Sequence, residues 1–159
     1  MVKLIKLIVS IIITLVAGAI GSIFTASAIP TWYLTLKKPF FNPPNYLFAP
    51  VWTILYILMG IAFFLIWTSK DQKKKSFKRK CFIYFFAQLV FNVLWSIGFF
   101  GLHSPLLGFI IILILWYLIF KTIVYFAKVE KTAAYLLYPY IAWVSFAAIL
   151  NFAVLILNF

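Results

Sequence analysis

Aromatic rings and amide side chains recur at helical spacing in three apolar stretches of this sequence. Residues three or four positions apart lie on one face of a helix. The face that combines rings with two amides carries Gln88, Asn92, Trp95 and Phe99. Two similar faces carry Trp52, Tyr56, Met59 and Phe63, and Tyr140, Trp143, Ala147 and Asn151. Ring faces for stacking, with a few donors to orient the molecule, are what a flat apolar ligand requires.

The amides decide which way these faces point. An unpaired amide in hydrocarbon costs several kcal/mol, so Gln88, Asn92 and Asn151 are predicted to face the interior of a bundle. The simpler interpretation is that each amide only bonds a neighbouring helix. The ring stripe that begins at Trp52 would also suit a lipid-facing surface. Taken together, the three faces favour a ligand pocket between helices.

Other chemistry is missing from the same stretches. No Asp, Glu, Lys, Arg or His lies near the centre of a predicted span, which argues against proton-coupled transport and against general acid–base catalysis. Neither a phosphate-binding glycine loop nor a pair of carboxylates occurs. The single cysteine, Cys81, and the single histidine, His103, provide no metal site, and we predict no required cofactor.

The composition is that of an integral membrane protein, whose surroundings are mainly lipid. Of its 159 residues, 67% are hydrophobic and 21% are aromatic, against roughly 45–50% apolar residues in soluble domains. Apolar runs of about twenty residues predict an all-α membrane protein, a single transmembrane domain over 1–159 with five helices. The predicted helices are 4–25, 47–68, 81–100, 105–126 and 133–157. The aromatic, proline-rich loop 26–46 is interpreted either as a lid over the helices or as an interfacial anchor.

The net charge of +12 predicts orientation, not a nucleic-acid partner, because the basic residues lie between the apolar runs. Lys37 and Lys38 fall on one side of the predicted bundle. Twelve residues fall on the other: Lys3, Lys6, Lys70, Lys73, Lys74, Lys75, Lys78, Arg79, Lys80, Lys121, Lys128 and Lys131. We therefore expect a cytoplasmic N-terminus and an outside C-terminus. The absence of an Arg- and Ser-rich transit segment favours a bacterial cytoplasmic membrane. The first span imitates a secretory signal, but its length favours a retained helix.

A longer pattern of residues resembles a known family over about residues 18–152. The loop and second span contribute Trp32-Tyr33, Leu36, Lys38-Pro39, Pro43-Pro44, Pro50-Val51-Trp52, Leu55-Tyr56, Met59-Gly60 and Ala62. The later spans add Gln88-Leu89, Asn92, Trp95-Ser96, Phe99-Phe100-Gly101, Leu137-Tyr138-Pro139-Tyr140, Trp143, Phe146-Ala147 and Leu150-Asn151. This pattern is similar to the TspO/MBR family, the tryptophan-rich sensory and translocator proteins, also called peripheral-type benzodiazepine receptors.

The resemblance implies a five-helix bundle, commonly a homodimer, that binds porphyrins such as protoporphyrin IX and haem. It places Tyr56, Asn92, Trp95 and Ala147 at pocket-facing positions. Together with the helix faces above and the loop, the predicted ligand-binding residues are Trp32, Phe48, Trp52, Tyr56, Gln88, Asn92, Trp95, Phe99, Tyr140, Trp143, Ala147 and Asn151. Trp52 and Trp143 match the tryptophans associated with light-dependent porphyrin breakdown. The sterol motif of some members needs a basic residue that the tail after Leu150-Asn151-Phe152 lacks, so sterol binding is not expected there. The loop has Phe40-Phe41 where the family often has tryptophan.

Three functions therefore remain open from the sequence. The leading hypothesis is a membrane sensor or carrier for tetrapyrroles and related flat ligands, including a passive transporter. The second is a photo-oxidative enzyme in which Trp52 and Trp143 are the candidate catalytic residues and the porphyrin carries the chemistry. The third is a structural bundle whose aromatic interior is packing alone.

Overall fold

The protein is a bundle of long helices in a computed structural model that describes residues 1–70 and 75–159. The long helices are α1 (Val2–Ala28), α3 (Phe48–Thr68), α4 (Lys75–Ser96), α5 (Pro105–Val129) and α7 (Tyr138–Leu157). The shorter elements are α2 (Trp32–Thr35), the 3₁₀ turn η1 (Asn45–Leu47), the π-helical turn η3 (Ile97–Gly101) and α6 (Lys131–Tyr135). Among the described residues, five helical stretches are long and apolar enough to cross a membrane. The predicted fold class is confirmed.

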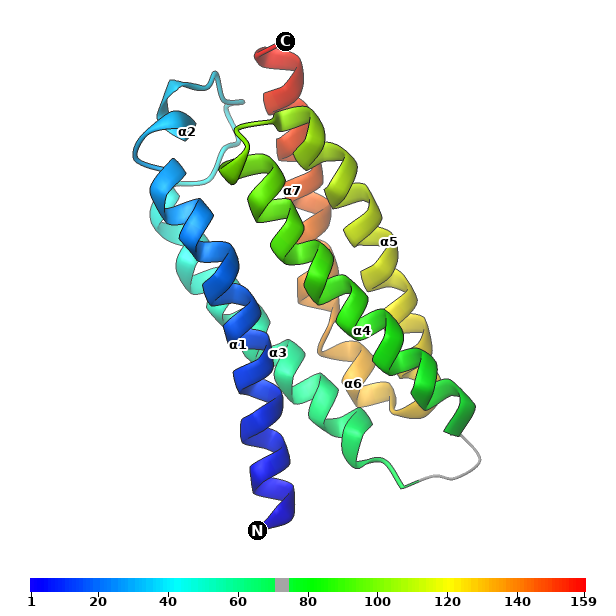
Figure 1. The fold of residues 1–159 in the computed structure, drawn as a ribbon. Helices are drawn as coiled ribbons and strands as arrows, with labels where there is room; N and C mark the ends of the chain where they lie inside the picture. The colour runs from blue at the N-terminus through cyan, green and yellow to red at the C-terminus, as the bar shows by residue number, and fades with distance from the viewer. Residues whose placement is uncertain (71–74) are drawn as a thin grey trace.

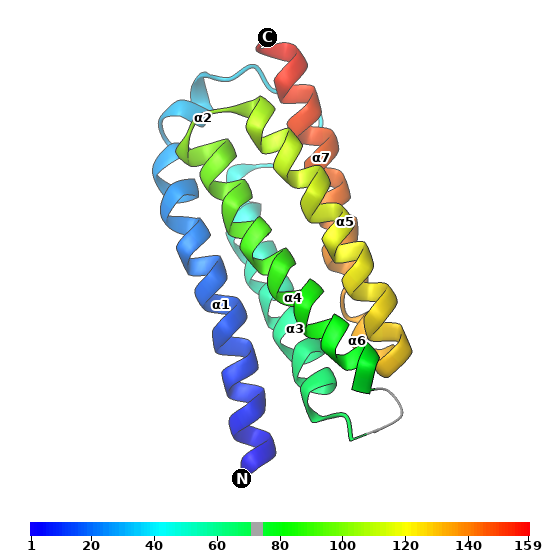
Figure 2. The same cartoon turned by 45° about the vertical axis from the view of Figure 1, so that its right-hand side comes forward.

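The N-terminus and the C-terminus lie at opposite ends of the bundle (Figure 1). The N-terminal end also holds the end of α3, the start of α4 and α6, whereas α2 lies at the C-terminal end (Figures 1 and 2). Helix α1 packs against α3 and α4, and α5 packs against α4, α6 and α7. Of the residues named in the charge argument, Lys73 and Lys74, and the side chain of Lys75, lie outside the described part of the chain.

Two helix boundaries differ from the expected ones for identifiable reasons. Helix α4 was expected from 81 but begins at Lys75, because its charged first turns remain helical beyond the apolar run. The last span was expected as one helix from 133, but α6 ends at Tyr135 and α7 begins at Tyr138. Pro139 lies in the first turn of α7, where proline is favoured because its missing N–H would have no intrahelical partner.

A π-helical turn ends α4 and places two large rings inside the bundle. The N–H of Leu102 bonds the carbonyl of Ile97 at 2.7 Å, a spacing of five residues that widens the helix. Phe99 and Phe100 are both buried, at 3% and 4% exposure. Helix α5 then begins immediately, with the Ser104 hydroxyl accepting from the N–H of Leu107 at 3.2 Å as an N-cap.

The half of the bundle near the N-terminal end is tightly packed. The rings of Phe63 and Phe85 stack at 4.5 Å, and Phe126 continues the stack at 5.9 Å from Phe85. Helices α1 and α3 also approach closely there, because a Cβ on Gly60 would lie 2.7 Å from the Cα of Ile11. The open space of the bundle therefore lies nearer the C-terminal end.

Candidate functional site

A chain of polar side chains crosses the bundle from α3 through α4 to α7. The Tyr56 hydroxyl donates to Asn92 Oδ1 at 2.5 Å, and Asn92 Nδ2 donates to the Tyr140 hydroxyl at 2.8 Å. Tyr140 in turn donates to Gln88 Oε1 at 2.8 Å, and Gln88 Nε2 lies 3.8 Å from the Met59 sulfur. The prediction that these amides face inward is confirmed, since Gln88 and Asn92 are each 1% exposed.

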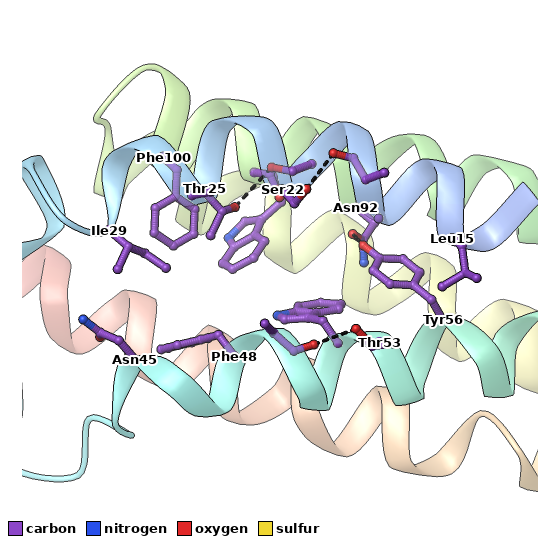
Figure 3. Close-up of a pocket in the computed structure, with 18 residues that line it drawn as sticks. Leu15, Ser22, Thr25, Ile29, Asn45, Phe48, Thr53, Tyr56, Asn92 and Phe100 are labelled. Carbon is purple, nitrogen blue, oxygen red and sulfur yellow. Dashed lines mark hydrogen bonds between the residues drawn. The ribbon is translucent and has the colours of Figure 1, made fainter. Parts of the chain in front are cut away.

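A cavity of about 380 Å³ lies between α1, α3 and α4, with Tyr56 and Asn92 in its wall (Figure 3). Its volume falls within the range of about 300–1,000 Å³ typical of ligand pockets. The lining residues are Leu15, Gly18, Ala19, Gly21, Ser22, Thr25, Ala26, Ile29, Asn45, Phe48, Ala49, Trp52, Thr53, Tyr56, Asn92, Trp95, Ser96 and Phe100.

Aromatic rings form the inner wall of this cavity. The Trp52 indole stacks on Tyr56 with 5.7 Å between ring centroids and lies 6.1 Å from Trp95 at 33°. Trp95 is held in place by its own N–H, which donates to Asn151 Oδ1 at 3.3 Å. The rings therefore present a fixed set of faces, inclined to one another by 30° and 33°, against which a flat molecule can stack.

The polar groups of the cavity are few and mostly satisfied. The hydroxyls of Ser22 and Thr25 donate to carbonyls of α1, at 2.7 Å and 3.2 Å. The donors left without a partner among the described residues are the Trp52 indole N–H, the second N–H of Asn92, the Ser96 hydroxyl and the side-chain amide of Asn45. None of the lining residues carries a charge. The cavity can therefore orient an apolar ligand but cannot neutralise an ionised group.

Five of the predicted pocket residues meet in the cavity: Phe48, Trp52, Tyr56, Asn92 and Trp95. Gln88, Tyr140 and Asn151 instead support its wall through hydrogen bonds, and Asn151 also donates to the Pro105 carbonyl at 2.8 Å. The remaining predicted residues, Trp32, Phe99, Trp143 and Ala147, are not in the lining.

Trp143 faces a second hollow, which we call the α3–α7 groove, of about 420 Å³. The groove is lined by Val51, Ile54, Leu55, Leu58, Pro139, Ala142, Trp143 and Phe146. Phe48, which lines the cavity, lies between it and Trp143, with 6.4 Å between the Phe48 and Trp143 ring centroids. Its Nε1 is buried and has no hydrogen-bond partner among the described residues.

The segment 29–47 covers the C-terminal end of the cavity, to which it contributes Ile29 and Asn45. Tyr33 is buried at 2% exposure, and its hydroxyl donates to Asn42 Oδ1 at 2.7 Å. Burial raises the pKa of this phenol to about 12, and the Asn42 bond lowers it slightly.

Two further contacts fix the segment to the helices. Trp32 packs on Phe99 at 5.5 Å and stacks on His103 at 4.8 Å. The backbone of Lys37 is bonded in both directions by the Asn158 side chain, at 2.9 Å for each bond. The segment is therefore anchored to η3, to the loop that follows it and to the last turn of the chain.

Helix α1 supplies a wall that the sequence analysis did not include. Gly18 packs directly against the Tyr56 ring, because a Cβ at this position would overlap the ring. Gly21 lies against Ser96, with 3.0 Å from a built Cβ to the hydroxyl. The signal in the sequence was the spacing of small residues at Gly18, Gly21, Ser22 and Thr25, which follows one helical face.

Comparison with known proteins agrees with this architecture. The chain matches the TspO/MBR family model over residues 10–157. It is 45% identical over 156 residues to the tryptophan-rich protein TspO of Archaeoglobus fulgidus, covering 98% of this chain and 99% of that one. It is 46% identical to the tryptophan-rich protein TspO of Chlorobaculum tepidum, over 91% and 90% of the two chains, and 33% identical to the human translocator protein, over 85% and 79%. With five membrane-crossing helices and a match over nearly its whole length, the chain belongs to the TspO/MBR family.

Proposed function

We propose that this protein is a membrane receptor or carrier that binds flat, mainly apolar ligands of the tetrapyrrole class in the cavity between α1, α3 and α4. The observation that carries the proposal is the cavity wall, where Trp52 stacks on Tyr56 at 5.7 Å and lies 6.1 Å from Trp95. A planar ring gains stacking energy on such faces, and the free N–H groups of Trp52 and Asn92 orient it.

The lining favours a metal-free tetrapyrrole such as protoporphyrin IX over haem. Haem iron is usually held by His, Cys, Met or Tyr. The lining includes no His, Cys or Met, and its tyrosine, Tyr56, already donates its hydroxyl proton to Asn92. We therefore expect the porphyrin ring, not a metal–ligand bond, to supply most of the affinity.

A titration with protoporphyrin IX tests the proposal in protein reconstituted into lipid nanodiscs, with tryptophan fluorescence as the signal. Saturable quenching near one ligand per chain is expected. Gly18→Leu should abolish it, because even a Cβ at Gly18 would overlap the Tyr56 ring, so the larger side chain must displace this part of the cavity wall. The matched control is Ala142→Leu, which enlarges an exposed alanine of the α3–α7 groove and should leave the titration unchanged. Identical titrations for both variants would place the ligand elsewhere.

The same proposal includes the orientation of the bundle. The start of α1, the end of α3 and α6 lie at the N-terminal end, and α2 lies at the other end (Figure 1). Lys3, Lys6, Lys70 and Lys131 belong to or adjoin the first three, and Lys37 and Lys38 follow α2 in the segment 29–47. The positive-inside rule then places the N-terminal end in the cytoplasm, in a bacterial cytoplasmic membrane as the simplest case.

The orientation is open to a labelling test on intact cells, because the single native thiol, Cys81, is fully buried. Lys37→Cys should react with a membrane-impermeant maleimide, and Lys131→Cys should not. The reverse pattern would invert the orientation.

Light-dependent porphyrin breakdown remains the second hypothesis, and homodimer formation remains a prediction. In the first of these, Trp52 is the better candidate for a direct role, because it lines the cavity and Trp143 does not. Under illumination, Trp52→Phe should therefore slow any loss of absorbance of the bound porphyrin more than Trp143→Phe does.

A further inference from the structure

One side of the cavity is built from side chains that are also exposed on the outer surface of the bundle. On α1 these are Ala19, Ser22 and Ala26, and on α3 they are Ala49 and Thr53. All five are small, and all five both line the cavity and are exposed. The cavity is therefore open between α1 and α3, and Figure 3 shows Ser22 and Thr25 of α1 facing Phe48 and Thr53 of α3 across this gap.

The other sides of the cavity are closed. Toward the N-terminal end, α1 and α3 are joined, because Thr14 Oγ1 donates to the Tyr56 carbonyl at 2.7 Å and Gly60 admits the backbone of Ile11. On the α4 side, Trp95 and Phe100 are only 7% and 4% exposed. At the C-terminal end, the segment 29–47 is held by buried Tyr33 and by the Lys37–Asn158 bonds described above.

The rim of the gap is suited to lipid. The Ser22 hydroxyl donates to the Ala19 carbonyl at 2.7 Å, and the Thr53 hydroxyl donates to the Ala49 carbonyl at 2.8 Å. Because these protons return to their own helices, the rim presents no free donor to the hydrocarbon. Bulky apolar residues such as Ile12, Val16 and Ile54 cover the neighbouring exposed surface of the same two helices. The gap is thus a break in an otherwise bulky lipid-facing surface.

We propose that the ligand enters and leaves the cavity sideways, from the bilayer, through the gap between α1 and α3. This proposal rests on the proposed function and narrows its ligands to membrane-dissolved amphiphiles, which insert their uncharged ring. Since no lining residue is charged, an ionised carboxylate on such a ligand stays outside the cavity. The water-facing end of the bundle, under the segment 29–47, is not the entrance.

A porphyrin that cannot leave the bilayer separates this route from an aqueous one. Protoporphyrin IX linked through one propionate to the headgroup of a phospholipid is incorporated into nanodiscs that contain the protein, and tryptophan quenching is measured against the mole fraction of this conjugate. In the unaltered protein, the conjugate should quench saturably, because its ring can still reach the cavity sideways. Absence of saturable quenching by the conjugate, while free protoporphyrin IX binds, would overturn the proposal without the use of any variant.

Narrowing the gap gives the second measurement. Ala19→Leu and Ala49→Leu each place a larger side chain at the rim, and a barrier higher by about 1.4 kcal/mol would slow association and dissociation about tenfold each. The diagnostic readout is the pair of rates, because a narrower gap slows association and dissociation by a similar factor, whereas lost contacts inside the cavity would speed dissociation. Ala142→Leu, at an exposed alanine of the α3–α7 groove, is the matched control and should leave both rates unchanged.

The outcomes distinguish the two proposals. Saturable binding with unchanged rates in both rim variants would overturn the route and leave the cavity as the binding site. Absence of saturable binding in the unaltered protein would overturn the proposed function and the route with it. Equal slowing in the Ala142→Leu control would also overturn the route, since the effect would not belong to the gap.

Discussion

The cavity and the α3–α7 groove are hollows of similar volume, about 380 and about 420 Å³, that use different faces of α3. The cavity includes Asn92 and Ser96 and rests on a continuous chain of hydrogen bonds. The groove is lined only by apolar residues and one tryptophan, whose indole N–H is buried without a partner among the described residues. The two hollows therefore differ in chemistry and not in volume. Only the cavity combines aromatic rings with polar groups that hydrogen bonds hold in place, which is the combination that a ligand site needs.

The largest expected effect concerns the contact that closes the cavity, for which the groove has no counterpart. In Gly60→Ala, the new Cβ would lie 2.7 Å from the Cα of Ile11, so the backbones of α1 and α3 must separate. Overpacking of this kind costs up to about 3 kcal/mol, and porphyrin binding should weaken as well. Unfolding in detergent measures the first effect and titration the second. Ala142→Val, on the exposed side of the groove, should change stability by less than about 0.5 kcal/mol.

The next effect compares Trp95, whose indole N–H has a hydrogen-bond partner, with Trp143, whose indole N–H has none among the described residues. Trp95→Phe leaves Asn151 Oδ1 without its indole donor, which should cost about 1–2 kcal/mol of unfolding free energy. Trp143→Phe removes an N–H that has no partner in the described structure, so the loss should be smaller. Equal losses in the two variants would show that ring volume alone matters and would remove the polar distinction between the hollows.

A smaller effect is expected on affinity. Trp52→Phe keeps a ring in the cavity but loses stacking area and a free N–H, so the Kd for protoporphyrin IX should rise roughly two- to tenfold. Trp143→Phe should change the Kd by less than about twofold, because Phe48 separates this ring from the cavity. A larger effect at Trp143 than at Trp52 would reverse the assignment of the two hollows.

The smallest effect is on the pH dependence of stability. It concerns the segment 29–47, which covers the cavity but not the groove. The pKa of Tyr33 is raised to about 12 by burial, above the ordinary value of 10.0. Tyr33 thus holds its proton more tightly in the folded state than in the unfolded state. Its contribution to the stability of the folded protein is therefore complete below about pH 10 and is lost as the pH rises toward 12. Tyrosinate absorbance and stability should change together in this window. Tyr33→Phe should remove that part of the change in stability, and an unaltered curve would contradict it.

The sequence was sufficient for the fold and for the supporting polar residues. Apolar runs of about twenty residues define spans without knowledge of packing, and an amide within such a run must be buried and paired. Asn92, Gln88 and Asn151 are therefore interior residues that helical spacing identifies. The spacing could not separate Tyr140 from Trp143, which are three positions apart on α7. The first joins the polar chain and the second faces the groove.

The contribution of α1 was harder to predict for a different reason. Its cavity residues are mainly Gly, Ala, Ser and Thr, whose importance is the space they leave and not a chemical group. Small residues at helical spacing indicate close helix approach. At Gly60 they serve that purpose, whereas at Ala19 and Ala49 the same kind of residue borders an opening. Close contact or an opening depends on how α1 is tilted relative to α3, and the types of the residues do not reveal this tilt.

The double hydrogen bond between Lys37 and Asn158 joins two parts of the chain that the ribosome produces far apart in time. Helices α1 and α3 can insert and pair as soon as they emerge, and Trp32 can pack on Phe99 once α4 and η3 have followed. The bonds that hold the backbone of Lys37, however, cannot form until residue 158 has been synthesised. A nascent chain arrested before that point would already hold the rings of the cavity in the membrane, with the segment over its water-facing end fastened at Trp32 but not at Lys37.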